Sequence, residues 1–273
     1  MEVQFWGVRG SYPEAGRRAS QFGGNTSCAR VMSRDGDVLI IDAGLGIHAL
    51  GNELVANKKN APLRLSLLLT HFHFDHIMGL PFFAPLYAPQ TEIAFYSAAE
   101  PEETQRNLGL LMKAPFFPVF FEQTPAKKLF KKIGAEGVVI GGIHVSFCPL
   151  RHPQGSVAFR LEENDKAVVF ATDTEPPAKG VDEVLTALAK GAACLIYDAM
   201  FTPEEYASRK RDWGHSTWLE GTKTAEAAGV ERLILSHLNP DYSDRDIRRI
   251  ERLARKMFPP TDCAQEGMRL RFK

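Results

Sequence analysis

Three histidines and one aspartate lie within six residues of this 273-residue chain, in the segment THFHFDH at residues 70–76. Imidazole nitrogens and carboxylate oxygens are ligands that zinc accepts at low coordination number. Without an ion, four such groups packed this closely would lack partners. The segment follows the apolar run 65–69, so we expect a loop at the end of a buried strand. The sequence therefore predicts that His71, His73, Asp75 and His76 form a metal site.

Three further candidate ligands occur later in the chain. They are His152 in RHPQG, Asp173 in ATDT and His237 in LSHL. Each stands where an apolar run ends, which is where a strand-end loop would present a ligand.

This ordered set resembles the signature of the metallo-β-lactamase superfamily over nearly the whole chain. The resemblance implies an α/β fold in the form of a four-layered αββα sandwich, with two divalent metal ions. By that resemblance one metal is held by His71, His73 and His152, the other by Asp75, His76 and His237, and Asp173 bridges them. Zn²⁺ is the expected metal, with Mn²⁺ or Fe²⁺ as alternatives, because His/Asp sites accept all three.

Asp42, in IIDAGLG, matches an earlier strand-end aspartate of the same family. Its expected role is to orient the 71–76 loop by hydrogen bonds. The alternative is an aspartate that simply forms a turn before two glycines.

The fold does not name the reaction, so the branch of the superfamily must come from other residues. A redox branch usually has Glu where this chain has His73, which disfavours a di-iron oxidase. The segment GHST at 214–217 resembles that of the phosphodiesterase branch, which includes tRNA 3′-processing nucleases and cyclic phosphodiesterases. There the residue matching His215 acts near the departing oxygen, and an acidic residue matching Asp198 partners it. The branch often has Glu at the second position, where this chain has the shorter Asp.

The residues around His215 also predict its surroundings. Thr217 and Glu220 have the spacing of a capping box, so a helix should begin beside this histidine. The N-terminus of a helix favours a nearby anion such as phosphate. The alternative interpretation is that His215 is a surface residue before a helix cap. The expected catalytic residues are thus Asp75, His215 and Asp198, with attack on phosphorus by a hydroxide held between the metals.

Two features set the expected size of the substrate. Bacterial tRNA-processing nucleases insert a tRNA-gripping arm between the ligands that match His152 and Asp173, and residues 153–172 are too few for one. The 33 basic and 33 acidic residues give zero net charge, which disfavours an extended nucleic acid partner. We therefore expect a small or cyclic phosphodiester such as a cyclic nucleotide. The alternatives are a thioester hydrolase of the glyoxalase type, a tRNA 3′-end-type ribonuclease without the arm, and a non-catalytic binding module.

The elements that must position these residues follow from hydrophobic patterning. Strand-like runs occur at 37–42, 64–70, 91–96, 138–150, 156–162, 166–172, 194–201 and 232–237. Helices are expected at 181–190, 216–228 and 244–257, the last with one apolar stripe and its arginines mostly outside it. No linker divides the chain, so we expect one domain over 1–273 with an excursion at about 98–130. The aromatic residues 115–121 of that excursion could stack on a base, contact a second subunit or join the core.

Cysteine usage and hydropathy bear on location. The four cysteines are far apart in sequence, at Cys28, Cys148, Cys194 and Cys263. This spacing predicts reduced thiols in a cytoplasmic protein. No signal peptide is visible, and no apolar run approaches the roughly 18 residues that a membrane span requires. A homodimer is the expected assembly.

Overall fold

The computed structural model describes residues 1–58 and 61–273, and within them the strands form two seven-stranded sheets. The first sheet has the order β14-β1-β2-β3-β4-β5-β6. Its strands are β14 (Arg269–Arg271), β1 (Glu2–Gly7), β2 (Cys28–Met32), β3 (Val38–Ile41), β4 (Leu63–Leu68), β5 (Thr91–Ser97) and β6 (Lys127–Lys132). The pairs from β3 to β6 are parallel, and the others are antiparallel.

The second sheet has the order β13-β12-β11-β10-β9-β8-β7. Its strands are β13 (Thr261–Cys263), β12 (Leu233–Ser236), β11 (Cys194–Asp198), β10 (Lys166–Ala171), β9 (Ser156–Glu163), β8 (Ile143–Leu150) and β7 (Val138–Ile140). Here β10 to β13 are parallel, while β7 to β10 form antiparallel pairs. Each sheet therefore joins an antiparallel part to a parallel part.

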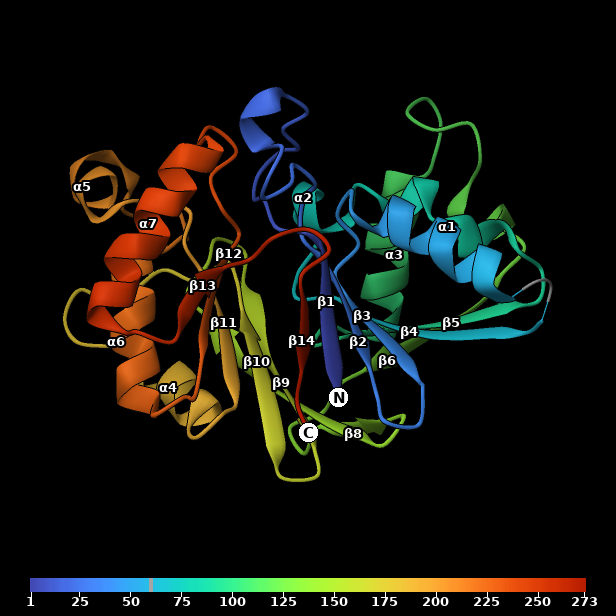
Figure 1. The fold of residues 1–273 in the computed structure, drawn as a ribbon. Coiled ribbons are helices and arrows are strands. Elements are labelled where there is room, and N and C mark those ends of the chain that lie inside the picture. The colour runs from blue at the N-terminus through green and yellow to red at the C-terminus, as the bar shows by residue number, and fades with distance from the viewer. Residues whose placement is uncertain (59–60) are drawn as a thin grey trace.

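Helices cover the outer faces of both sheets, as Figure 1 shows. On the first sheet lie α1 (Ile47–Lys58) and α3 (Pro101–Leu111), and on the second lie α4 (Glu183–Ala189), α6 (Trp218–Ala228) and α7 (Asp244–Met257). The layers run helix, sheet, sheet, helix. The expected α/β fold, a four-layered αββα sandwich, is confirmed.

The main hydrophobic core fills the space between the two sheets. Val3 and Phe5 of β1 and Phe159 and Leu161 of β9 are almost wholly buried within one cluster. Alternate residues of a strand face opposite sides of its sheet, so the same strands also send side chains outward to the helices. The two sheets are thus held at a fixed distance from one another.

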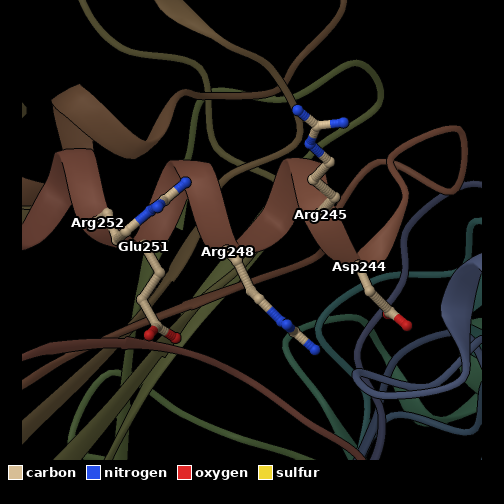
Figure 2. Close-up of a pocket in the computed structure, with 5 residues that line it drawn as sticks. All are labelled: Asp244, Arg245, Arg248, Glu251 and Arg252. Carbon is tan, nitrogen blue, oxygen red and sulfur yellow. The ribbon is translucent and has the colours of Figure 1, made fainter.

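The predicted helix at 244–257 is confirmed to the residue in α7. Ile247, Ile250 and Ala254 are buried against the sheet. Its arginines face solvent, and a shallow hollow lined by charged side chains lies on this face (Figure 2). The side chains that line it are Asp244, Arg245, Arg248, Glu251 and Arg252. The helical spacing of the apolar residues therefore predicted both the buried face and the solvent-exposed face of this helix.

The run at 138–150 is not one continuous strand. Gly141 and Gly142, at φ of 53° and 77°, turn the chain between β7 and β8. Left-handed backbone is readily adopted by glycine, so the glycine pair marks a tight turn. The two short strands then pair with each other as a hairpin.

The excursion at about 98–130 contains α3, a 3₁₀ turn at Phe121–Gln123 and the start of β6. It returns to the first sheet and supplies an edge strand. Phe121 is buried in the second hydrophobic cluster, whereas Phe116 is 82% exposed. The aromatic residues of this segment thus divide between core and surface.

All four cysteines are buried and none forms a disulfide. No helix in the part of the chain that the structure describes has the length and apolar character needed to cross a bilayer.

Candidate metal centre

The seven predicted ligands converge on one edge of the two-sheet sandwich. The 71–76 segment follows β4, His152 follows β8, Asp173 follows β10 and His237 follows β12. The carboxyl ends of parallel strands meet at the same edge of a sheet, which is where open α/β folds place ligands. The structure forms two close groups from these side chains, His71 with His73 and His152, and Asp75 with His76, Asp173 and His237.

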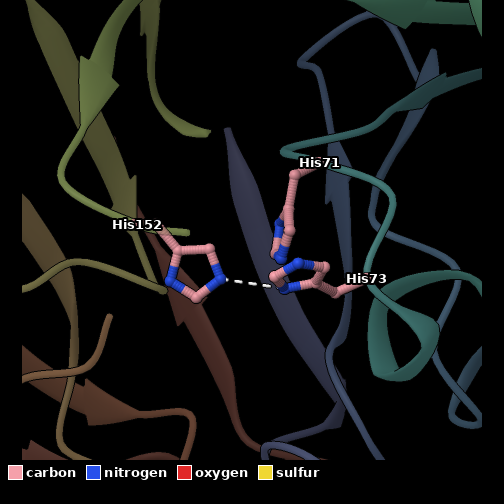
Figure 3. A group of neighbouring side chains, drawn as sticks. All are labelled: His71, His73 and His152. Carbon is pink, nitrogen blue, oxygen red and sulfur yellow. Dashed lines mark hydrogen bonds between the residues drawn. The ribbon is translucent and has the colours of Figure 1, made fainter. Parts of the chain in front are cut away.

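The first group consists of three imidazoles that point toward one another (Figure 3). Nε2 of His152 lies 2.9 Å from Nδ1 of His73. The His71 ring centroid lies 4.5 Å from that of His73 and 4.9 Å from that of His152. His71 is buried, while His73 and His152 are partly exposed, so this group is open to solvent on one side.

The second group is buried at every position. Nε2 of His76 lies 3.2 Å from Nε2 of His237, and Nε2 of His237 lies 3.1 Å from Oδ2 of Asp75. Asp75 and His76 lie on α2 (Phe74–Ile77), Asp173 follows β10 and His237 follows β12. Two carboxylates and two imidazoles therefore share one closed volume.

Asp173 belongs to the second group and also faces the first, with one carboxylate oxygen toward the histidines of each. Its Oδ1 is 3.9 Å from Nε2 of His152 and 4.0 Å from Nε2 of His71. Its Oδ2 is 3.0 Å from Nε2 of His76 and 3.4 Å from Nε2 of His237. This is the position that a carboxylate bridging two cations would need.

One unpaired atom tests whether these residues fit a metal. Nε2 of His71 is buried and has no hydrogen-bond partner among the residues that the structure describes. Buried polar atoms are rarely left unsatisfied, and each exception calls for an explanation. A divalent cation held between His71, His73 and His152 supplies the missing partner, so the donor set fits such an ion.

The electrostatics keep most of these groups in the form that binds metal. Burial opposes ionisation of Asp75, but His76 and His237 together lower its pKa far below the ordinary range. Burial likewise opposes ionisation of Asp173, and the same two histidines hold its pKa well below its usual value. Burial lowers the pKa of His71, so its imidazole is neutral. Metal ligands must be ionised carboxylates and neutral imidazoles, which these are.

His76 is the exception, and its surroundings explain why. Burial lowers its pKa, but the carboxylates of Asp173, Asp75 and Asp42 outweigh that and raise it well above the ordinary value. Nδ1 of His76 lies 2.8 Å from Oδ2 of Asp42. Asp42 also accepts hydrogen bonds from the backbone N–H and the hydroxyl of Thr70. The expected contact between Asp42 and the 71–76 loop is therefore present.

Several residues of the centre have left-handed backbone although they are not glycine. Asp42, Asp173 and His237 have φ of 58°, 59° and 53°. Left-handed backbone costs roughly 1–2 kcal/mol per non-glycine residue. Such residues cluster at functional sites, where the surrounding structure holds them in place.

His215 lies next to the two groups, as a third cluster with Asp173, Asp198 and His237. Its Nδ1 is 3.0 Å from Oδ2 of Asp198 and 3.7 Å from Oδ1 of Asp173. Burial lowers the pKa of His215, but Asp198 and Asp173 overcome this and raise it to about 9. The neighbouring carboxylates thus favour the charged form of the imidazole.

Asp198 itself is fully buried and tightly held. It accepts hydrogen bonds from the backbone N–H groups of Asp173, Met200 and Ser216. The predicted helix beside His215 is also present, because α6 begins at Trp218 with Thr217 as its N-cap. The Thr217 side chain accepts from the backbone N–H of Glu220, as the capping pattern predicted.

Two supporting residues were missed from sequence. Glu175 accepts hydrogen bonds from the Tyr206 hydroxyl and from the backbone N–H groups of Asp212 and Gly214. Oε1 of Gln154 lies 2.7 Å from Nε2 of His73. The available signal was proximity, because each lies two residues from a candidate ligand.

The glycine-rich opening segment also reaches the centre. The backbone N–H of Ser11 donates to Oδ2 of Asp75 at 2.7 Å. A Cβ at Gly10 would lie 2.2 Å from Cε1 of His237, so only glycine fits there. His48 and His144 belong to none of the metal-binding groups found in residues 1–58 and 61–273.

The sequence is similar to a known protein family and to several curated proteins. Residues 38–238 match the family described as Beta-lactamase superfamily domain. A protein named Ribonuclease Z from Prochlorococcus marinus is 25% identical over 334 aligned positions that cover all of both chains. Another Ribonuclease Z, from Methanothermobacter thermautotrophicus, is 25% identical over all of this chain and 97% of the relative.

Solved structures share the fold at lower identity. The metallo-beta-lactamase fold protein YhfI from Bacillus subtilis superposes with a TM-score of 0.73 at 20% identity, covering 98% of each chain. A diphosphatase of the PhnP family gives 0.72 at 17% identity, covering 100% of this chain and 98% of that one. The short form of human tRNase Z gives 0.66 at 18% identity and covers both chains completely.

Proposed function

The chain belongs to the beta-lactamase superfamily and is a metal-dependent hydrolase, and from that premise we propose that it cleaves a small or cyclic phosphodiester. The relatives named Ribonuclease Z, and the diphosphatase of the PhnP family, support phosphate esters as the substrate class. Within the superfamily the fold alone would not choose among reactions.

The contact between His215 and Asp198 is the observation that carries the proposal. Oδ2 of Asp198 holds Nδ1 of His215 at 3.0 Å, which leaves Nε2 as the free ring nitrogen. A charged imidazole beside the metal groups can give a proton to an oxygen that leaves phosphorus. A thioester hydrolase of the glyoxalase type has no evident need for this pair.

The proposed roles of the other residues follow from their positions. His71, His73 and His152 would hold one divalent cation, Asp75, His76 and His237 the other, and Asp173 both. Bound cations would supply Lewis-acid polarisation of the phosphoryl group and a nucleophile at neutral pH. Asp42 fixes His76 and the Ser11 N–H fixes Asp75. Asp198 accepts from Nδ1–H of His215 and so favours the imidazolium form, whose second proton, on Nε2, is the one available to the leaving group.

The short connection between His152 and Asp173 supports a small substrate. It consists of β9, β10 and the turn at Asn164 and Asp165, which leaves no segment to grip a large RNA. The alignment to one Ribonuclease Z extends over 334 positions, more than the 273 residues of this chain, so that relative carries insertions. We further propose zinc as the metal, with manganese or iron as alternatives.

Cleavage of RNA ends is the second candidate, and the surface of α7 favours it. Arg245, Arg249 and Arg252 recur at helical spacing and are exposed, and none is in the ion pairs found in residues 1–58 and 61–273. Arg245 and Arg252 border the hollow of Figure 2. Arginines spaced along a helix can contact successive phosphates of a nucleic acid.

We also propose a homodimer, on the basis of an apolar hollow of about 700 Å³ behind the 71–76 loop. Phe74, Phe82, Leu110 and Phe116 line it and are 53–82% exposed. Exposed apolar patches of this kind mark protein–protein contacts or ligand-binding grooves, and we assign this one to a second copy of the chain. Light scattering of purified protein should give twice the mass of the chain, and a monomer at micromolar concentration would contradict the dimer.

The test of the reaction is turnover of bis(p-nitrophenyl) phosphate by protein loaded with zinc or manganese. On a diester with an alkoxide leaving group, such as a 2′,3′-cyclic nucleotide, His215→Ala should lose roughly 10²–10⁴-fold in rate while keeping its metal content. The loss should be smaller on bis(p-nitrophenyl) phosphate, because nitrophenolate leaves without a proton. His144→Ala, at an exposed histidine outside the site, is the matched control and should behave as the wild type. Hydrolysis of lactoylglutathione without any phosphodiester turnover would contradict the proposal and indicate a thioester hydrolase. Loss of metal in His215→Ala would show that His215 supports metal binding and would contradict its role as a proton donor.

A further inference from the structure

An exposed tryptophan stands at the rim of the metal centre. Trp213 lies two residues before His215 and is 55% exposed. The buried ring of Phe201 contacts both side chains, with centroids 5.9 Å from His215 and 6.4 Å from Trp213. The indole is therefore the outermost member of a row of rings that starts at the centre.

The backbone on either side of Trp213 is fixed. Asp212 and Gly214 both have left-handed backbone, at φ of 64° and 79°. Their N–H groups donate to the two carboxylate oxygens of Glu175 at 2.7 and 2.8 Å. The carbonyl oxygen of Gly214 lies 2.7 Å from Nδ1 of His152. The tryptophan is thus carried on a rigid segment that is attached to a candidate metal ligand.

Single exposed hydrophobic residues are common and need no explanation by themselves. Trp213 differs because its backbone is held on both sides and its ring contacts Phe201 and Lys210. A rigid aromatic side chain loses little conformational entropy when a second ring stacks on it, and this makes prepared aromatics effective binding groups.

A positive charge accompanies the indole. Nζ of Lys210 lies 3.5 Å from the Trp213 ring centroid and 5.3 Å from that of Phe201. Lys210 takes part in none of the ion pairs found in the described parts of the chain, 1–58 and 61–273. Its ammonium is therefore held by aromatic rings, as in a cation–π contact, and is available to an anion.

We propose that Trp213 and Lys210 form a binding site for an aromatic ring attached to the phosphate, such as a nucleobase or an aryl group. Trp213 stacks on the ring, and Lys210 faces the anionic phosphate ester. If His215 protonates the departing oxygen, the ring belongs to the leaving group, because Trp213 lies on the His215 side of the centre. That side assignment rests on the proposed function, whereas ring binding does not.

Calorimetry on the metal-loaded protein tests ring binding without turnover. The probes are adenosine 5′-monophosphate and ribose 5-phosphate, which share sugar and phosphate and differ in the base. Wild-type protein should bind the nucleotide more tightly. Trp213→Ala should weaken nucleotide binding by roughly 5- to 100-fold and leave ribose 5-phosphate unchanged, while Trp213→Phe retains most of the affinity.

Three results of this titration would overturn the proposal. Wild-type protein with equal affinity for the two probes has no ring site. Trp213→Ala with unchanged affinity shows that the ring binds elsewhere. Equal weakening for both probes shows that Trp213 only supports the fold. His144→Ala serves as the control for a substitution at the surface.

Steady-state kinetics then test whether the bound ring belongs to the leaving group or to the group that stays on phosphorus. Bis(p-nitrophenyl) phosphate and methyl p-nitrophenyl phosphate release the same nitrophenolate and differ in the group that stays on phosphorus. Trp213→Ala should raise KM equally for both and change kcat less than about twofold. A rise for the first substrate alone would overturn the leaving-group assignment. If the wild type hydrolyses neither diester, the proposed function fails, and the titration still decides ring binding.

Discussion

The two candidate metal-binding groups differ in burial and in charge. His71, His73 and His152 bring no carboxylate of their own, and two of the three are partly exposed. Asp75, His76 and His237 are buried together with Asp173 and concentrate negative charge in a closed volume. Because charges interact more strongly away from water, we expect the buried group to hold its cation more tightly. The open group is the one that solvent and substrate can reach.

The contacts that support the two groups also differ in burial and charge. The buried group is fixed by the Asp42 carboxylate and the Ser11 N–H. The open group is supported by Gln154, an exposed side chain, and by the carbonyl of Gly214. A buried group with its own carboxylates thus faces a more exposed group without one. The carboxylate of Asp173 has one oxygen toward each group, and the rings of His71 and His76 also meet across them, with centroids 4.3 Å apart.

The largest effect is expected from removing the shared carboxylate. Asp173→Ala should lose both cations, and turnover should fall by more than the roughly 10- to 100-fold that loss of an outer contact costs. Metal analysis by mass spectrometry measures the stoichiometry. Asp165→Ala, at an exposed turn, is the control. Two bound equivalents in Asp173→Ala would contradict the bridging role.

Single-ligand variants should separate the two groups. His73→Gln should lose the cation that a chelator removes first from the wild type, and His76→Gln should lose the one that it removes last. A chelator titration followed by metal analysis records both phases. Identical release curves for the two variants would show that the difference in burial has no effect on affinity.

The pH dependence tests the group beside the centre. The pKa of His215 is raised to about 9, so its proton is present at neutral pH and is lost as pH rises through that value. Turnover should therefore fall on the alkaline side. Asp198→Asn removes the charge that favours the imidazolium, so the alkaline limb should move to lower pH. An alkaline limb that stays in place in this variant would exclude His215 as the titrating acid.

The smallest effects should come from the supporting residues. Asp42→Asn should weaken the tighter cation by roughly 10- to 100-fold, since it orients a ligand from a buried position. Gln154→Ala removes one exposed hydrogen bond and should change the affinity of the weaker cation by less than about tenfold. Metal titrations of both variants provide the comparison. The reverse order would mean that the open group is the rigid one.

The positions of the candidate ligands could largely be predicted from the sequence, because they follow apolar strands whose ends converge. The 71–76 segment, His152, Asp173 and His237 each stood at such an end. The apolar stripe of α7 and the Thr217 cap were equally visible, since both depend on local spacing. Features that depend on residue spacing within one segment can therefore be predicted well from the sequence.

Contacts between distant segments were beyond such reasoning. Glu175 supports the backbone at 212–214 through bonds that exist only once β10 and the later loop are side by side. The three-residue edge strands β13 and β14 are too short to show a period. The division of residues 138–150 depended on one glycine pair within an otherwise strand-like run.

The most direct test of the shared centre is anomalous diffraction from crystals of the zinc- or manganese-loaded protein. Two peaks should appear, one on the Oδ1 side of Asp173 with His71, His73 and His152, and one on the Oδ2 side with Asp75, His76 and His237. A single peak under saturating metal, or two peaks of which only one contacts Asp173, would contradict a centre built from two groups around one carboxylate.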